Sequence, residues 1–70
     1  MSYILENIYY LRIKNKLTQR EMAEIIGISV STLRRMEKFD KSVRTHSGMI
    51  HRICDRFEIT ADELLLVPMD

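Results

Sequence analysis

The sequence is poor in several residue types, and each shortage narrows what the chain can be. Its 70 residues contain one cysteine, one proline, two glycines and no tryptophan. A single cysteine excludes an intrachain disulfide. No apolar run approaches the roughly 20 residues that a membrane-spanning helix needs, and no signal peptide is recognisable. From these three observations we expect a cytoplasmic protein without membrane contact. There is also no internal repeat and no low-complexity segment.

The chain is also short, which limits its core. We expect residues 1–70 to form a single domain. A domain of this size removes only roughly 60% of its unfolded surface from water. Without a disulfide or a metal, such a core usually supplies about 3 to 5 kcal/mol of stability. Such a domain either packs its helices very closely or buries further surface against a second copy of the chain. We therefore expect a dimer.

The charges are unevenly distributed, although the formal net charge is only +1. All eleven basic residues lie between Arg12 and Arg56, where five acidic residues oppose them and leave a net charge of +6. From Phe57 onward the chain has four acidic residues and no basic one, a net charge of −4. Such polarity favours one face meeting an anionic partner. The alternative is that these charges only solvate helix surfaces.

Three helix starts are marked by capping residues. Thr18 and Glu21 have the spacing of a capping box, in which each side chain accepts a free backbone N–H of the first turn. Thr60 and Glu63 repeat it, and Ser29 is a third N-cap. Apolar pairs with hydrophobic-staple spacing flank all three starts: Leu17 with Met22, Ile28 with Leu33, and Ile59 with Leu64.

Two further helices are indicated by apolar periodicity. One spans about residues 2–14 and carries Ile4, Ile8 and Leu11 on one stripe. The other spans about residues 46–57 and carries Met49, Ile50, Ile53 and Phe57. Because Gly48 is unfavourable inside a helix, this second helix is expected to begin only at Ser47. The stretch KFDKSVRTHS before it reads as a loop.

No segment alternates apolar and polar residues as a half-buried strand does, and Pro68 lies beyond the last helix. The sequence therefore predicts an all-α fold, a compact bundle of five short helices.

The second and third helices are separated by a very short turn. The helix over residues 18–26 ends at Gly27, which tolerates a left-handed backbone, and only Ile28 separates it from the cap at Ser29. Two helices crossing at roughly 90–120° through such a turn form a helix-turn-helix, whose second helix can enter a DNA major groove. Ile28, Leu33 and Met36 should face the core. The opposite face carries Val30, Ser31, Arg34, Arg35 and Lys38.

The stretch TQREMAEIIGISVSTLRRMEK, residues 18–38, resembles the helix-turn-helix of the phage repressor, Cro and Xre family. It matches that family at Gln19, Ala23, Gly27, Leu33 and Met36. The likeness extends to LR at residues 11–12, to Glu37, and to FEITADELL at residues 57–65. It implies a sequence-specific, double-stranded DNA-binding transcriptional regulator. Members of this family usually act as two-fold dimers on pseudo-palindromic operators, so the resemblance leads us to expect a dimeric repressor.

The resemblance also assigns roles to residues. Val30, Ser31 and Arg35 match positions that read base edges. Arginine can pair in bidentate fashion with guanine O6 and N7, and valine can cover a thymine methyl group. The residues expected on the DNA backbone, which position the protein without reading sequence, are Gln19, Ser29, Thr32, Arg34, Lys38, Lys41, Ser42, Arg44 and Thr45.

The resemblance further implies a structural ion pair between Arg12 and Glu37, the alternative being two solvated charges. The chain departs from the family where many members have glycine and then proline, since it has Phe39 and Val43 there. For this reason the sequence does not predict the path of the loop over residues 38–46. Phe39 either packs against the fourth helix or lies exposed near DNA.

Other chemistry has weak support. His46, His51 and Cys54 lack a fourth ligand for a structural zinc, so we predict no metal site. Cys54 is expected to be a small buried side chain, and Tyr3, Tyr9 and Tyr10 to be packing residues rather than a stacking platform for a single strand. No catalytic arrangement has a usable spacing, so we predict neither an enzyme nor a cofactor.

The C-terminal stretch LLLVPM, residues 64–69, is more apolar than one short helix can bury. Leu64 and Leu65 are expected to close the core. That leaves Leu66, Val67 and Met69 as the expected homodimer interface. The alternative function is a protein-interaction module, or an antitoxin-like protein that uses the same fold to bind a protein partner.

Overall fold

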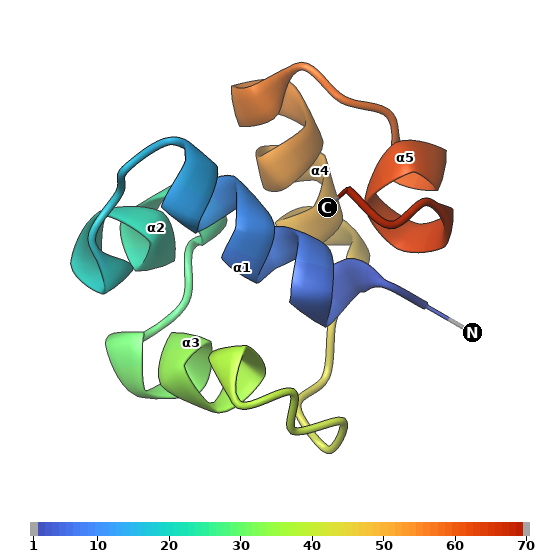
Figure 1. The fold of residues 1–70 in the computed structure, drawn as a ribbon. Coiled ribbons are helices and arrows are strands. Elements are labelled where there is room, and N and C mark those ends of the chain that lie inside the picture. Colours follow the sequence, from blue (N-terminus) through green and yellow to red (C-terminus); the bar gives the residue numbers. More distant parts are fainter. Residues whose placement is uncertain (1, 70) are drawn as a thin grey trace.

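The computed structural model describes residues 2–69, which form five helices (Figure 1). In chain order they are α1 (Ile4–Lys14), α2 (Gln19–Ile26), α3 (Val30–Glu37), α4 (Ser47–Phe57) and α5 (Ala61–Leu66). No strand occurs among residues 2–69, so the predicted all-α bundle is confirmed.

The first helix begins later than its apolar pattern predicted, at Ile4 rather than near Ser2. The Ser2 hydroxyl accepts the N–H of Ile4 at 3.2 Å. This local side-chain bond satisfies a free N–H of the first turn from outside the helix, so Ser2 acts at the helix start instead of continuing it.

Helix α1 runs through the middle of the arrangement in Figure 1, with α3 on one side and α5 on another. It packs against both. Helix α2 packs against α3 and α4, and α4 packs against α5. One face of α3 is thus held from two directions, by α1 and α2, while its other face stays outside the bundle.

The core takes one stripe of apolar side chains from every helix. Its buried members are Ile4, Leu5, Ile8, Leu11, Met22, Ala23, Ile26, Leu33, Met36, Met49, Ile53 and Leu64. The partly buried side chains around it include Leu17, Ile28 and Ile59, the apolar residues that precede the three predicted caps. Burial of these stripes is the main driving force that holds helices this short in place.

The predicted caps are present. Thr18 with Glu21 and Thr60 with Glu63 each form a complete capping box. The Ser29 hydroxyl accepts the N–H of Thr32 at 3.1 Å at the start of α3. Helix α4 has a cap that the sequence analysis did not recognise, because Nδ1 of His46 accepts the N–H of Met49 at 3.3 Å.

Asn7 is a polar residue inside the core stripe of α1 and is only 1% exposed. Its Nδ2 donates to the carbonyl oxygens of Leu64, at 2.7 Å, and Val67, at 2.9 Å, while its Oδ1 accepts the N–H of Met69 at 3.1 Å. These bonds satisfy backbone groups left free where α5 ends. They hold the C-terminal segment against α1.

Helices α1 to α4 are each followed by a residue with a left-handed backbone: Lys16, Gly27, Phe39 and Glu58. After each of these, the next N–H bonds to a carbonyl five residues earlier, as Asp40 does to Arg35 at 3.2 Å. This is the bond of the Schellman motif, which satisfies a free carbonyl at a helix end. Glycine, the usual signal for this motif, stands at Gly27 alone among the four.

Candidate nucleic-acid interface

The turn between α2 and α3 depends on Gly27. Its φ is +83°, and a Cβ added there would lie 3.0 Å from Nε of Arg52. Arg52 reaches over from α4 and donates to the carbonyls of Ile25, at 3.0 Å, and Glu24, at 3.2 Å. It therefore closes the last turn of α2, whose carbonyls have no partner within the helix. The sequence analysis missed this arginine, which carries no local signal for the role.

Helix α3 has a buried and an exposed side. Leu33 and Met36 are fully buried, and Ile28 packs partly against the core, as predicted. Val30 and Thr32 are half-buried. The side chains that face solvent are Ser29, Ser31, Arg34, Arg35 and Lys38.

A polar network ties the end of α3 to α1 and α2. Nε and Nη2 of Arg12 donate to the two carboxylate oxygens of Glu37 at 2.5 and 2.9 Å, and Nη1 donates to the Leu17 carbonyl at 3.0 Å. The Glu37 side chain is only 8% exposed. The structure thus brings Arg12 and Glu37 together as a bidentate, largely buried pair. Such a pair fixes the position of α1 relative to α3 more surely than it increases the free energy of unfolding.

Gln19 links this buried pair to the surface. Its Nε2 donates to Glu37 at 3.0 Å, and its Oε1 accepts from Nε of Arg34 at 3.2 Å. The exposed Arg34 is therefore oriented by an amide that is itself oriented by the ion pair. Side chains held in this way lose less freedom when they meet a ligand.

The loop after α3 starts with an unusual residue. Phe39 has a φ of +57°, which favours glycine, and it occupies the place where the resembling family often has one. Its ring lies 6.4 Å from that of Tyr9, edge to face, and the side chain is 46% exposed. Of the two alternatives for Phe39, a core position against the fourth helix is therefore wrong, because the side chain is exposed and its ring contacts Tyr9. The left-handed turn directs the ring toward α1.

Arg35 is held by this same loop. Its Nε lies 3.3 Å from Oδ2 of Asp40, and its Nη2 donates to the Ser42 hydroxyl at 3.0 Å. Ser42 in turn donates to Oδ1 of Asp40 through its hydroxyl at 2.6 Å and through its N–H at 2.9 Å. These Ser42 bonds, and then Arg35, lower the pKa of Asp40. Its carboxylate is charged at neutral pH.

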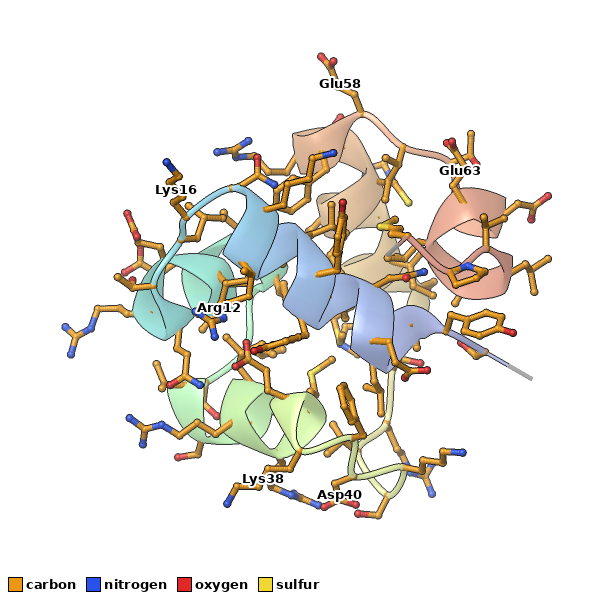
Figure 2. All side chains as sticks on the ribbon, in the orientation of Figure 1. Arg12, Lys16, Lys38, Asp40, Glu58 and Glu63 are labelled. Carbon is orange, nitrogen blue, oxygen red and sulfur yellow. The ribbon has the colours of Figure 1, made fainter. Side chains whose placement is uncertain are left out.

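The side of the molecule that carries α3 is positively charged. From residue 29 to residue 45 the exposed cations are Arg34, Arg35, Lys38, Lys41 and Arg44. The two acids in this stretch, Glu37 and Asp40, are each paired with an arginine. Figure 2 shows Lys38 and Asp40 at the α3 edge, and Glu58 and Glu63 toward the α4 and α5 side. Glu58 and Glu63 of the acidic C-terminal part thus lie away from α3 and its basic loop (Figure 2).

A family model described as helix-turn-helix matches residues 8–64, which include α2, the turn and α3. The chain belongs to the helix-turn-helix family of phage repressor, Cro and Xre type. This confirms the resemblance. No curated protein and no solved structure matches the chain. The family consists of DNA-binding regulators, and the helix-turn-helix of this chain is a module for double-stranded DNA.

In this helix-turn-helix protein, the residues expected to read bases lie on α3. Ser31 and Arg35 are exposed, whereas Val30 is half-buried and packs partly against the core. The residues expected on the DNA backbone lie at the start of α2, on α3 and in the following loop. Those in the loop, Lys41, Ser42, Arg44 and Thr45, are all exposed.

The C-terminal residues of the helix-turn-helix domain divide as follows. Leu64 is fully buried and Leu65 partly so, as predicted. Leu66 and Val67 are 59% and 51% exposed. Met69 instead packs partly against the core, next to its backbone bond with Asn7.

The remaining features have structural explanations. Cys54 is partly buried against the core, and burial raises the pKa of its thiol, with the nearby charge of Glu63 as a smaller cause. Within residues 2–69, no three histidine, cysteine or acidic side chains gather as a metal site would require. None of the helices in that range has the length and hydropathy to cross a bilayer.

Proposed function

We propose that this helix-turn-helix protein is a sequence-specific transcriptional repressor in the cytoplasm, which binds a pseudo-palindromic operator as a homodimer and places α3 in the major groove. The observation that carries the proposal is the exposed face of α3, where Ser31, Arg34 and Arg35 project from a helix whose other face is fully buried. On this proposal Val30, Ser31 and Arg35 read base edges.

Contacts to the DNA backbone fall to the residues around that face. They are Gln19, Ser29, Thr32, Arg34, Lys38, Lys41, Ser42, Arg44 and Thr45. The network from Arg12 through Glu37 and Gln19 to Arg34 supports this assignment, because it fixes where α3 lies relative to α2. A rigid arrangement of phosphate-binding groups sets the register in which the recognition helix meets the bases.

The test is selection of bound duplexes from a random pool, with the wild type and with Arg35→Ala. A pseudo-palindromic consensus is expected from the wild type, and Arg35→Ala should relax it at one symmetric pair of positions. The affected base pair should lose about 1 to 3 kcal/mol of discrimination. Lys41→Ala is the matched control, since loss of a backbone contact weakens all sequences alike.

The salt dependence of binding gives an independent measure. The logarithm of the affinity should fall with the logarithm of the salt concentration, with a slope of about −0.9 for each neutralised phosphate. Absence of any consensus, with weak binding that is equal for wild type and Arg35→Ala, would contradict the proposal. That outcome would favour the alternative of a module that binds a protein partner.

For the homodimer, we propose a two-fold contact through Leu66, Val67 and Met69. The exposure of Leu66 and Val67 supports it, as do the bonds by which Asn7 fixes the segment that carries them. Recognition helices in such a dimer must lie about 34 to 36 Å apart, one turn of DNA.

Sedimentation equilibrium on Leu66→Asp tests this contact. The wild type should be a dimer and the variant a monomer, because a charge in an apolar interface is costly. Ile13, which is 50% exposed on α1, offers the control variant Ile13→Asp. An unchanged dimer mass for Leu66→Asp would place the interface elsewhere.

A further inference from the structure

The loop after α3 contains an acidic residue where the proposed function needs positive charge. Asp40 stands among Lys38, Lys41 and Arg44, three residues after the end of α3 at Glu37. A carboxylate at this place repels the phosphates of any DNA that approaches α3. We therefore expect Asp40 to have a role that offsets this repulsion.

The way in which Asp40 and Ser42 hold Arg35 supplies that role. They occupy Nε and one N–H of Nη2, which together form the lateral edge of the guanidinium group. Arginine has five N–H donors in a fixed planar fork. The terminal edge, made by Nη1 and the second N–H of Nη2, has no partner in the described part of the chain. Two parallel donors on one such edge are what guanine O6 and N7 require.

The backbone brings Asp40 to Arg35 independently of their charges. The N–H of Asp40 bonds to the Arg35 carbonyl at 3.2 Å, and the N–H of Phe39 bonds to the Met36 carbonyl at 2.9 Å. These two bonds make up the Schellman motif that ends α3. The carboxylate is also fixed from its other side, because Oδ1 accepts both the hydroxyl and the N–H of Ser42.

Ser42 has no side-chain proton left for a phosphate in this arrangement. Its hydroxyl donates to Asp40 and accepts from Arg35. A phosphate oxygen only accepts hydrogen bonds, so it could not bind this hydroxyl without displacing it from Asp40. The geometry therefore favours a role for the Ser42 side chain toward Arg35 in place of the DNA-backbone contact that the family resemblance implies for it.

We propose that Asp40 and Ser42 are positioning residues for DNA specificity, which hold the guanidinium of Arg35 by its lateral edge and present its terminal edge to a guanine. This inference rests on the proposed function, because it assumes that Arg35 reads a base. The Arg35 side chain is 55% exposed, so it stays accessible while it is held. An arginine restrained in its binding geometry loses less rotamer freedom on binding and tolerates a wrong base less readily.

The charge of Asp40 has a separate effect on affinity. It opposes binding to phosphates whatever their sequence, so it lowers specific and non-specific binding alike. Only its hold on Arg35 increases the difference between specific and non-specific binding, which is the quantity on which an operator-binding protein depends.

The experiment uses the duplex selected by the wild-type protein and a second duplex in which the base pair read by Arg35 is changed. The measured quantity is the ratio of the two dissociation constants, the discrimination ratio, for wild type, Asp40→Ala, Asp40→Asn and Ser42→Ala. Circular dichroism and urea unfolding confirm that each variant is folded. Glu24→Gln is the control for loss of one exposed acidic charge away from Arg35.

We expect the discrimination ratio to fall about 3- to 10-fold in Asp40→Ala, less in Ser42→Ala, and not at all in Glu24→Gln. Binding to an unrelated duplex should become tighter in Asp40→Ala. In an Arg35→Ala background, Asp40→Ala should no longer change the ratio, because the group that it positions is absent.

Two outcomes would overturn the proposal while leaving the proposed function intact. One is an unchanged or increased discrimination ratio in Asp40→Ala, which would make Asp40 a simple charge or a restraint that keeps Arg35 from the base. The other is an equal fall in the Arg35→Ala background. If the wild type selects no sequence at all, the proposed function itself fails, so the two failures are distinguishable.

Discussion

The two ends of α3 satisfy the same backbone requirement in different ways. Before α3, the left-handed residue is Gly27, and the cap at Ser29 begins the helix two residues later. After α3, the left-handed residue is Phe39, whose ring meets that of Tyr9 on α1, and the last residue of the helix, Glu37, pairs with Arg12 of α1. The first end is specified by short-range residue choices, whereas the second relies on side chains that the fold brings together.

The contacts of Phe39 show how the second end tolerates a residue with a Cβ. A left-handed backbone costs such a residue roughly 1 to 2 kcal/mol. Its edge-to-face pairing with Tyr9 is worth about 0.5 to 1.5 kcal/mol beyond burial. The two effects are of similar size, so the ring can offset most of the strain. At Gly27 no such offset is needed.

The largest expected effect is on the stability of the fold, from Glu37→Ala. This change removes the ion pair that holds the C-terminal end of α3. This change leaves the largely buried Arg12 without its carboxylate and Gln19 without an acceptor. We expect a loss of about 2 to 4 kcal/mol in the free energy of unfolding, measured by urea denaturation. Glu24→Ala, on the exposed surface of α2, should change it by less than about 0.5 kcal/mol. A loss below about 1 kcal/mol for Glu37→Ala would show that the pair does not hold this end of α3.

The next largest effect is expected from Gly27→Ala, which changes the left-handed residue before α3. The new Cβ meets Arg52 at 3.0 Å, and its backbone is left-handed. We expect a loss of about 1 to 2 kcal/mol in thermal or urea unfolding. The comparison is Gly48→Ala in α4, where the backbone is helical and the nearest atom is Nδ1 of His46 at 3.2 Å. Equal losses at the two glycines would rule out the conformational explanation.

A smaller effect is expected at position 39, after α3, when phenylalanine is replaced by alanine or by glycine. Both Phe39→Ala and Phe39→Gly remove the ring, but only the glycine variant relieves the left-handed strain. We expect Phe39→Gly to be more stable than Phe39→Ala by about 1 kcal/mol. If Phe39→Ala proves the more stable variant, the left-handed backbone at this position is not strained. The contact of Phe39 with Tyr9 then has no strain to offset.

The smallest effect is on the pKa of Asp40, which Ser42 lowers most through its hydroxyl and then through its N–H, with Arg35 contributing less. Because the folded-state pKa is below the ordinary value of 3.8, the carboxylate stabilises the fold above that value. This contribution is lost as the pH falls through the lowered pKa. Ser42→Ala should raise the Asp40 pKa more than Arg35→Ala does, as measured by NMR titration of the carboxyl carbon. The reverse order would identify the arginine as the main partner.

Much of the fold follows from signals that lie within one or two turns of chain. The boxes at Thr18 and Thr60, the cap at Ser29 and the apolar stripes predicted the helices, and Gly27 predicted the tight turn that precedes α3. These interactions join residues three or four positions apart, so their spacing is visible in the sequence. The start of α1 lies two residues later than its apolar pattern predicted, at Ile4, whose N–H bonds to the Ser2 hydroxyl.

The cap at His46 was missed although its partner Met49 is only three residues away. Three further contacts that the sequence analysis missed join residues that are distant in the chain. Asn7 bonds to the carbonyl of Leu64, 57 residues away, and Arg52 bonds to that of Ile25, 27 residues away. Phe39 finds Tyr9 across the bundle. No local spacing distinguishes such pairs from solvated side chains.

The sequence by itself determined the five helices, the helix-turn-helix and the family, because capping, periodicity and turn chemistry act between near neighbours. The tertiary structure decided what holds the C-terminal end of α3, where Glu37 meets Arg12 and Phe39 meets Tyr9. Those features depend on side chains that meet only after the helices have packed, since a hydrogen bond needs its donor and acceptor within about 3 Å wherever they lie in the chain.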